Sequence, residues 1–430
     1  MIKLFLIILI IFTGCSTEKK KNIFNKKKNI EKEKVLLDEK NQNNKILKKN
    51  FNSNLEINLT EQLEKKFFKE LKNNYGRNEY KSISYNFSKY KLKKIKNFSN
   101  FEPKIVFDKE GLIFFEKKGT LIKYDYLKKV IWKENHYSKQ EKKSNLLINF
   151  GNDKNTLIVT DSLAKYYRID LATGKLLWSK INSSPFNSQI KIFKDKFYAI
   201  DFENAIHCFS LKNGEKIWSY QTENFFIKSK KKLSIIIDNQ KVIFNNSIGD
   251  ITALDANDGV LIWQTPTQNN QIYAKTISLR TSDLVSENES IFFSNNRNEF
   301  YSLNKNDGFL NWKQTINSDI RPIITNKTIF TVSNEGFLFL IDSRNGNILK
   351  TQDLFDNFND RTRKLLKPIG MILGVDKIYI TLNNGRMIVA ELKDGKFFKI
   401  IKIDSNSISV PTIFNKKLYI VKDNSIVEFD

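Results

Sequence analysis

The chain has 430 residues, of which 40% are apolar and 13% aromatic, so it can bury a large core and is not disordered throughout. Its formal net charge of +25 would attract a polyanion, but Lys, Asn, Ile and Phe are all abundant, and these are the residues that AT-rich codons favour. Because no zinc-finger spacing, recognition-helix pattern or aromatic-Gly RNA-binding signature accompanies the charge, we expect no nucleic-acid partner.

The N-terminus, MIKLFLIILIIFTGCS, has the pattern of a secretion signal. Lys3 precedes an apolar run, residues 4–12, which is too short to span a bilayer as a stable helix. The Thr-Gly pair and Cys15 that follow resemble the signal of bacterial lipoproteins, which implies cleavage after residues 1–14 and a lipid anchor on Cys15. Several acyl chains hold a protein firmly on a membrane, since each buried methylene contributes about 0.8 kcal/mol. Ser16 resembles the sorting signal for the outer membrane.

The next two segments differ in their patterns. Residues 15–54 are rich in lysine and asparagine and carry no periodic apolar residues, which predicts a flexible tether. Within residues 55–79, the stretch TEQLEKKFFKELK begins with a potential N-cap, Thr60, and then places three large apolar residues on one helical face. We therefore expect a short amphipathic helical segment there, docked on the domain that follows.

From about residue 80 the pattern changes to short alternating strands separated by Asn, Asp and Gly. A frame such as DLATGKLLW, residues 170–178, recurs along this part. It contains all five tryptophans, Trp132, Trp178, Trp218, Trp263 and Trp312, and four of them follow a glycine by four residues: Gly174, Gly214, Gly259 and Gly308. Two later frames carry Lys350 and Lys399 instead. The frame positions are 38 to 49 residues apart, a period typical of four-stranded propeller blades.

The residue types suit that architecture. Asn-Gly and Asp-Gly pairs supply the positive φ of tight turns, and an indole on an outer strand can cover a turn glycine and fill the gap between neighbouring blades. Three strand-like runs follow the seventh frame, and residues 80–91 can supply a fourth strand that closes the ring. The expected fold of residues 80–430 is therefore all-β: an eight-bladed β-propeller of four-stranded antiparallel blades. Blade one lacks the glycine and blades six and seven lack the tryptophan, so we expect looser packing there.

The repeat D-x-x-x-G-x-x-x-W after a strand resembles the pyrroloquinoline-quinone-type propeller repeat. Together with the lipoprotein signal, it makes the chain similar to the BamB-like outer-membrane assembly lipoproteins. The resemblance implies a non-catalytic, lipid-anchored scaffold on the periplasmic face of the outer membrane, monomeric within a larger complex. It also implies binding of a BamA-like barrel-assembly protein through loops between blades, here residues 225–232 and 277–284. The contacts expected are Phe226, Ile227, Lys230, Arg280 and Asp283, an apolar anchor ringed by charge.

Two alternatives stay open. A quinoprotein dehydrogenase would hold its quinone and a calcium ion in the central funnel, and in that family a vicinal disulfide stacks on the cofactor. This chain has no Cys-Cys pair and its tryptophans are used in the blades, so we expect no cofactor, no metal site and no catalytic residue. His136 and His207 fall in different blades without the spacing of a metal site or a triad, and Cys208 in AIHCFS is expected to be buried. The other alternative is an envelope propeller that binds glycan or another protein.

Overall fold

The computed structural model of the protein describes residues 50–57, 74–81, 87–95, 103–222, 228–229, 231–267 and 279–430. All of these belong to one compact unit, Asn50–Asp430. The predicted signal peptide, the lipidated Cys15 and the predicted helix of residues 60–72 lie outside the described residues. Within the described part of the chain, no helix is long and apolar enough to cross a membrane.

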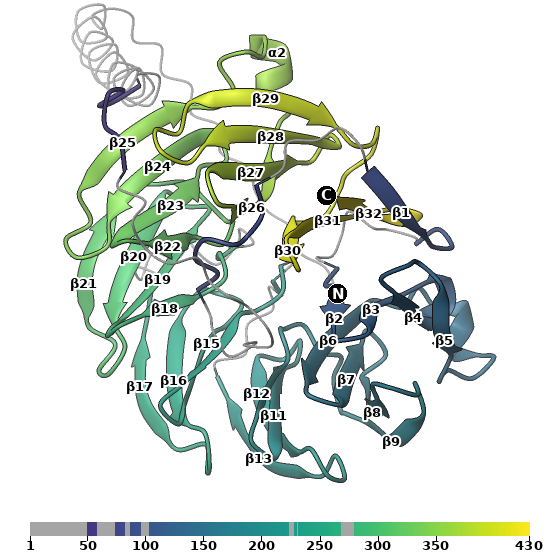
Figure 1. Ribbon diagram of the computed structural model, residues 1–430. Helices are drawn as coiled ribbons and strands as arrows, with labels where there is room; N and C mark the ends of the chain where they lie inside the picture. The colour runs from purple at the N-terminus through teal and green to yellow at the C-terminus, as the bar shows by residue number, and fades with distance from the viewer. Residues whose placement is uncertain are drawn as a thin grey trace, which may run out of the picture. The chain divides into compact units, whose positions relative to one another are not determined.

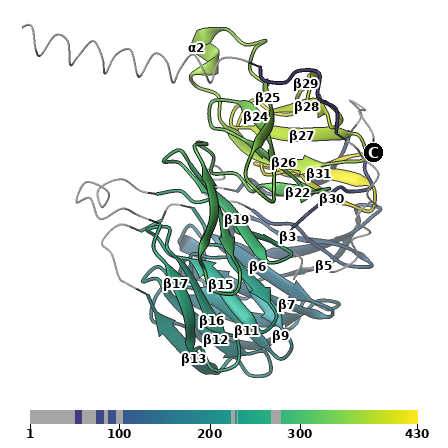
Figure 2. The same cartoon turned by 90° about the vertical axis from the view of Figure 1, so that its left-hand side faces the viewer.

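The described strands form eight antiparallel sheets of four strands each, arranged around a centre as the blades of a propeller (Figure 1). The predicted all-β, eight-bladed fold is thereby confirmed. In each blade the first strand lies nearest the centre and the fourth lies at the rim (Figure 1). The short helix α2 (Asp360–Arg363) lies outside the sheets, in the connection from blade six to blade seven (Figure 2). Two 3-10 turns span Lys117–Gly119 and Glu141–Lys143.

The first four blades follow one another along the chain. Blade one consists of β2 (Val106–Phe107), β3 (Gly111–Phe115), β4 (Leu121–Asp125) and β5 (Val130–Glu134). Blade two consists of β6 (Ile148–Asp153), β7 (Thr156–Asp161), β8 (Lys165–Asp170) and β9 (Leu176–Ile181). Blade three consists of β10 (Lys191–Phe193), β11 (Lys196–Ile200), β12 (Ala205–Ser210) and β13 (Lys216–Gln221). Blade four consists of β14 (Ile235–Asp238), β15 (Lys241–Asn245), β16 (Ile251–Asp255) and β17 (Leu261–Thr265).

The remaining blades continue in the same way. Blade five consists of β18 (Val285–Glu287), β19 (Ser290–Asn295), β20 (Glu299–Asn304) and β21 (Leu310–Gln314). Blade six consists of β22 (Ile323–Thr325), β23 (Thr328–Val332), β24 (Phe337–Asp342) and β25 (Ile348–Asp353). Blade seven consists of β26 (Pro368–Leu373), β27 (Lys377–Leu382), β28 (Arg386–Glu391) and β29 (Phe397–Lys402). Blade eight consists of β30 (Thr412–Phe414), β31 (Lys417–Lys422), β32 (Ser425–Phe429) and β1 (Phe87–Lys91).

Burial differs between the middle and the rim of a blade. β3 and β7 are buried at every position, because a neighbouring blade covers each face. Their residues are mostly β-branched, aromatic or leucine, which suit a strand that is covered on both sides. β9 and β13 at the rim alternate between exposed and half-buried positions. The core of the molecule therefore lies in the seams between blades.

The ring closes through the N-terminal strand, as the sequence predicted. β1 pairs antiparallel with β32, with Phe87 opposite Phe429 and Lys91 opposite Ser425. This pairing leaves β32 with a partner on both edges, so blade eight presents no central strand to solvent.

A buried carboxylate joins the closing strand to both neighbours. Glu428 of β32 is 1% exposed and accepts hydrogen bonds from Ser88 Oγ at 3.0 Å and Tyr90 Oη at 2.9 Å. Lys417 of blade eight and Lys128 of blade one both donate to it at 3.1 Å. One side chain therefore connects β1, blade eight and blade one.

Candidate functional site

Each tryptophan lies against the glycine of the next blade. A Cβ at Gly174 would lie 2.8 Å from the ring of Trp132, and the other four seams repeat this contact. The indole nitrogen also donates to the carbonyl oxygen three residues before that glycine. The pairs are Trp132 with Leu171 at 3.2 Å, Trp178 with Leu211 at 3.1 Å, Trp218 with Ala256 at 3.4 Å, Trp263 with Lys305 at 3.2 Å and Trp312 with Ser343 at 3.1 Å.

The contact joins two different frames of the sequence. Gly214 stands four residues before Trp218 in its own blade, yet its neighbour in space is Trp178 of the preceding blade. Gly259 and Gly308 meet Trp218 and Trp263 in the same way, and Gly346 meets Trp312. Each copy of the repeat therefore supplies the glycine for the seam with the preceding blade and the tryptophan for the seam with the next blade.

A bulge turns the frame residue toward the seam. In each of blades one to seven, the pairing register between the third and fourth strands shifts by one residue. The shift follows the residue that pairs with the frame tryptophan or lysine. In blade two, for example, Arg168 pairs with Trp178 and the shift falls between Arg168 and Ile169. A bulge bends a strand and redirects its side chains. The sequence analysis did not predict this feature, because a one-residue insertion leaves the alternation pattern almost unchanged.

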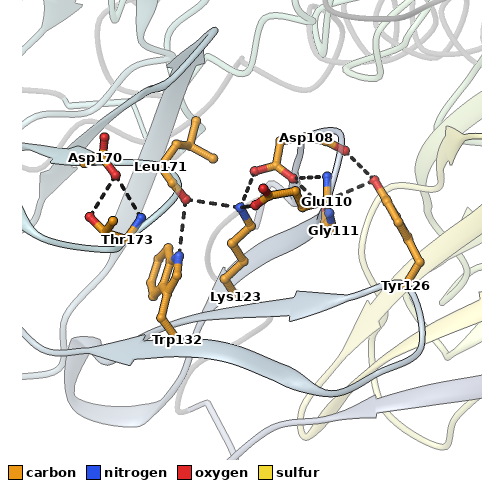
Figure 3. Close-up of polar contacts among 9 residues, drawn as sticks. All are labelled: Asp108, Glu110, Gly111, Lys123, Tyr126, Trp132, Asp170, Leu171 and Thr173. Atoms are coloured by element: carbon orange, nitrogen blue, oxygen red, sulfur yellow. Dashed lines mark hydrogen bonds and ion pairs between the residues drawn. The ribbon is translucent and has the colours of Figure 1, made fainter.

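The first seam contains a buried cation that the sequence analysis missed. Lys123 of β4 is 0% exposed, and its ammonium lies 2.7 Å from Asp108 Oδ2 and 2.6 Å from Glu110 Oε2. It also donates to Leu171 O at 3.3 Å, the acceptor that it shares with Trp132 (Figure 3). These acceptors compensate for the loss of water around the ammonium. Its role is in blade packing.

The predicted partner-binding residues fall in two groups. Phe226, Ile227 and Lys230 lie outside the described residues. Arg280 and Asp283 are described, between blades four and five. They do not pair with each other; both pair with the connection from blade five to blade six.

The two ion pairs run in parallel between the connections. Arg280 Nε lies 2.9 Å from Asp319 Oδ2, and Arg321 Nη1 lies 3.3 Å from Asp283 Oδ2. Arg280 keeps a side-chain exposure of 38%, whereas Asp283 keeps 15%. Arg280 is therefore the more accessible of the two predicted residues.

Further contacts join three successive connections into one surface. Lys231, after blade three, donates from its ammonium to the carbonyl oxygen of Asp319, after blade five. Asn295 and Asn317 form a parallel bridge between blade five and the connection that follows it. Residues 231, 280–283 and 317–321 therefore form what we call the connection surface. The sequence analysis missed Asp319 and Arg321, although their opposite charges stand just before a blade, as those of Arg280 and Asp283 do.

A segment from the N-terminal side runs along the inner strands near the centre (Figure 1). Asn74 Nδ2 donates to Ile324 O at 2.8 Å and Asn74 Oδ1 accepts from Ile324 N at 3.0 Å. Arg77 forms a parallel bridge with Leu373 of β26, and Val375 N donates to Tyr80 O at 2.8 Å. Residues 74–81, which we call the axis segment, contain no helix, although the sequence analysis placed residues 74–79 in the helical segment.

The axis segment also reaches the connection surface. The guanidinium of Arg321 lies 3.9 Å from the centre of the Tyr75 ring, a stacking contact in which arginine is favoured. Arg321 therefore contacts both Asp283 and Tyr75. Arg77, Asn78 and Tyr80 further along the segment are 6%, 4% and 2% exposed, so this stretch of the segment is part of the packed interior.

A quinone with calcium would need oxygen ligands gathered at one place. Among the described residues, no three His, Cys, Asp or Glu side chains gather closely enough to hold a metal ion. The axis segment bonds to the inner strands of blades six and seven. We therefore assign no step of chemistry to such a group.

The remaining candidate nucleophile, Cys208, and the two histidines are buried or hydrogen-bonded to neighbouring protein groups. Cys208 is 0% exposed, as expected, and burial raises the pKa of its thiol to about 12, which disfavours the reactive thiolate. His207 Nε2 lies 2.8 Å from Asp201 Oδ2 in a buried pair. His136 Nε2 lies 3.1 Å from Gly174 O, and burial lowers the pKa of the imidazole.

Comparison at the sequence level identifies one family. The profile of a family described as outer membrane protein assembly factor BamB matches residues 117–352. No curated protein matches the sequence.

Comparison of structures gives several similar propellers. BamB from Moraxella catarrhalis superposes with a TM-score of 0.64 at 14% identity, covering 80% of this chain and 100% of that one. A europium-containing methanol dehydrogenase gives 0.63 at 9% identity, covering 81% and 88%. Quinohemoprotein alcohol dehydrogenase from Comamonas testosteroni gives 0.60 at 9% identity, covering 82% and 78%. At these identities the likeness shows the propeller fold alone.

Proposed function

The chain belongs to the family described as outer membrane protein assembly factor BamB, whose profile spans more than half of its length, and we propose that it acts as a non-catalytic scaffold of outer-membrane assembly. In this proposal Cys15 carries the lipid anchor, residues 15–54 supply the tether, and the propeller faces the periplasm. Its partner is a BamA-like barrel-assembly protein, and the complex helps to insert outer-membrane proteins.

The connection surface is the observation that carries the proposal. Charged residues from three successive connections are held in fixed positions by two ion pairs and by the bond from Lys231 to Asp319. Rigid loops on a closed scaffold lose little conformational entropy when a partner binds. Phe226 and Ile227 belong to the connection after blade three, so they would add the apolar anchor beside this charged rim.

Arg280 is the residue that we expect to exchange partners. Its side chain is 38% exposed, whereas that of its ion-pair partner Asp319 is 13% exposed. A carboxylate of the barrel-assembly protein can therefore approach the guanidinium from its exposed side. Asp283 is more buried than Arg280, and its ion pair with Arg321 stabilises the conformation of the connection surface.

The test is a pull-down from detergent-solubilised envelope with the Lys230→Glu, Arg280→Glu double variant. We expect reduced copurification of the barrel-assembly protein, because reversing a charge at the rim of an interface slows association. We expect an unchanged thermal midpoint, because the Arg280 side chain is half-exposed. The matched control reverses two exposed lysines of blade eight and its flank, Lys94 and Lys416, whose side chains are 73% and 75% exposed.

The pull-down also separates the alternatives. Equal copurification of the double variant and the control would remove the site assignment. Recovery of a glycan or of a redox protein instead of a barrel-assembly protein would contradict the proposed function itself.

A further inference from the structure

The seam between blades six and seven lacks the indole that closes the five seams before it. Lys350 stands at the frame position of β25, opposite Leu340 and next to the usual bulge. A Cβ at Gly395 of blade seven would meet Leu338 at 2.9 Å and Gln352 at 3.8 Å. Lys350 is nevertheless 0% exposed, so another part of the molecule covers this seam.

Residues 50–57, which we call the strap, lie over Lys350. The ammonium donates to Ser53 O at 2.7 Å and to Leu55 O at 3.2 Å. Phe51 pairs antiparallel with Thr351, and each donates its amide to the carbonyl of the other at 3.2 Å. The sequence analysis had placed residues 50–54 in the flexible tether.

The other end of the strap reaches blade seven. Ile57 N donates to Lys393 O at 2.8 Å, two residues before Gly395. Glu56 pairs with Lys393 at 2.6 Å, and the Ile57 side chain packs against the core shared by blades six and seven. The strap thus bonds to the turn whose counterparts accept an indole nitrogen in the five tryptophan seams.

We propose that the rim of the seam between blades six and seven is a strand-binding site, that its ligand is this chain's own residues 50–57, and that Lys350 is its recognition residue. The site binds an extended peptide, two of whose carbonyl oxygens accept hydrogen bonds from the Lys350 ammonium. The strap replaces the indole as the element that joins the two blades.

The seam between blades six and seven depends on the strap, because the strap supplies acceptors for the Lys350 ammonium. A buried ammonium needs acceptors, and two of those of Lys350 are main-chain carbonyls of the strap. Burial lowers the pKa of Lys350, which agrees with an ammonium held away from water. If the strap leaves, Lys350 loses these acceptors and blade seven loses the bond to Lys393. An indole seam has no such dependence, because both of its halves belong to the blades.

The first test measures hydrogen exchange at the Phe51 and Ile57 amides of the full chain. For Lys350→Met, which keeps the length of the side chain and removes its donors, we expect exchange at both amides to rise on the order of tenfold or more, because the charge-assisted bonds are lost. Lys399→Met, at the same frame position in β29, should leave both rates unchanged. Unchanged protection in Lys350→Met, or an equal rise in both variants, would overturn the proposal.

A second variant acts from the strap and keeps the blades intact. Phe51→Pro removes the amide that donates to Thr351, and we expect faster exchange at the Thr351 amide together with a lower thermal midpoint. Adding Lys350→Trp to Phe51→Pro should restore the midpoint, because an indole at this position can close the seam on Gly395. If tryptophan rescues nothing, the strap does not replace the indole and the proposal is wrong.

Discussion

Gly259 illustrates at a single residue what the repeat requires. Its φ of +77° lies in the left-handed region, and a Cβ there would lie 2.7 Å from the indole of Trp218. Glycine is needed for both reasons. Sequence alone predicted the turn and an indole beside it, but the partner belongs to the preceding blade, which only the spatial order of the sheets reveals.

We predict that Gly259→Ala lowers the free energy of unfolding by about 1–3 kcal/mol from backbone strain alone, with a further loss from the clash with Trp218. The two causes separate in a double-variant cycle with Trp218→Ala, measured by denaturant unfolding. The strain persists without the indole, whereas the clash does not, so the alanine should cost less in the Trp218→Ala background. An equal cost in both backgrounds would show that the indole does not press on Gly259.

In blade one, Lys128 stands four residues before Trp132, at the position that glycine occupies in the next four frames. It adopts a φ of 70° in the shortened turn, and its ammonium lies 5.2 Å from the Tyr90 ring and 3.1 Å from Glu428. The polar contacts with blade eight thus take the place of an indole. Looser packing was expected of blade one, and in its seam with blade two Trp132 and Lys123 are both buried.

At the scale of the strand, β1 and β32 depend on Glu428. Burial opposes ionisation of this carboxyl, but hydrogen bonds from Lys128, Lys417, Tyr90 and Ser88 outweigh it, so its pKa is lowered below the usual 4.5. A lowered pKa means that the unfolded chain binds the proton more readily. The carboxylate therefore contributes stability above about pH 4.5 that is lost as the pH falls through the folded pKa.

We predict that Glu428→Gln is less stable than the wild type at pH 7 and that the difference shrinks as the pH falls below 4.5. Thermal midpoints between pH 3 and 7 measure this. Glu215→Gln is a suitable control, since that side chain is 63% exposed and its partner Lys180 also reaches solvent, so the change should lower the midpoint little. A constant difference between Glu428→Gln and wild type across the range would contradict the role of ionisation.

The strands were predictable from sequence to a far greater degree than the connections. Alternation, turn pairs and the recurring tryptophan depend on local physics, and they placed the closing strand near residue 91 correctly. The connection surface depends on which loops meet, and the pairs Arg280–Asp319 and Arg321–Asp283 join residues about 40 positions apart. No local pattern specifies such pairs. Arg280 and Asp283 were proposed from a family resemblance, and their ion-pair partners Asp319 and Arg321 were not predicted.

At the scale of the whole molecule, the axis segment joins blades six and seven to the connection surface. Asn74 bonds to blade six, Arg77 and Tyr80 bond to blade seven, and Tyr75 stacks on Arg321. The inner strands of these blades are thereby occupied by the chain itself. This contact was not predictable from sequence, because residues 74–79 were assigned to the helical segment and carry no strand alternation.

We predict that pyrroloquinoline quinone with calcium does not raise the thermal midpoint of the full chain and gives no bound-cofactor spectrum. A ligand that binds the folded state stabilises it by mass action, by about 2.7 kcal/mol at a hundredfold excess over its Kd, so binding would be visible. A stoichiometric spectrum would contradict both this prediction and the non-catalytic assignment.

The pairing of β1 with β32 imposes an order on biosynthesis. The partner of Phe87 is Phe429, so a growing polypeptide can stack its blades one after another on the ribosome but cannot complete the circle until the final strand emerges. Until that moment both end blades expose a face. A translational stall before β32 would therefore release an open arc of blades with apolar faces exposed, and a chaperone has most to protect in the interval before β32 emerges.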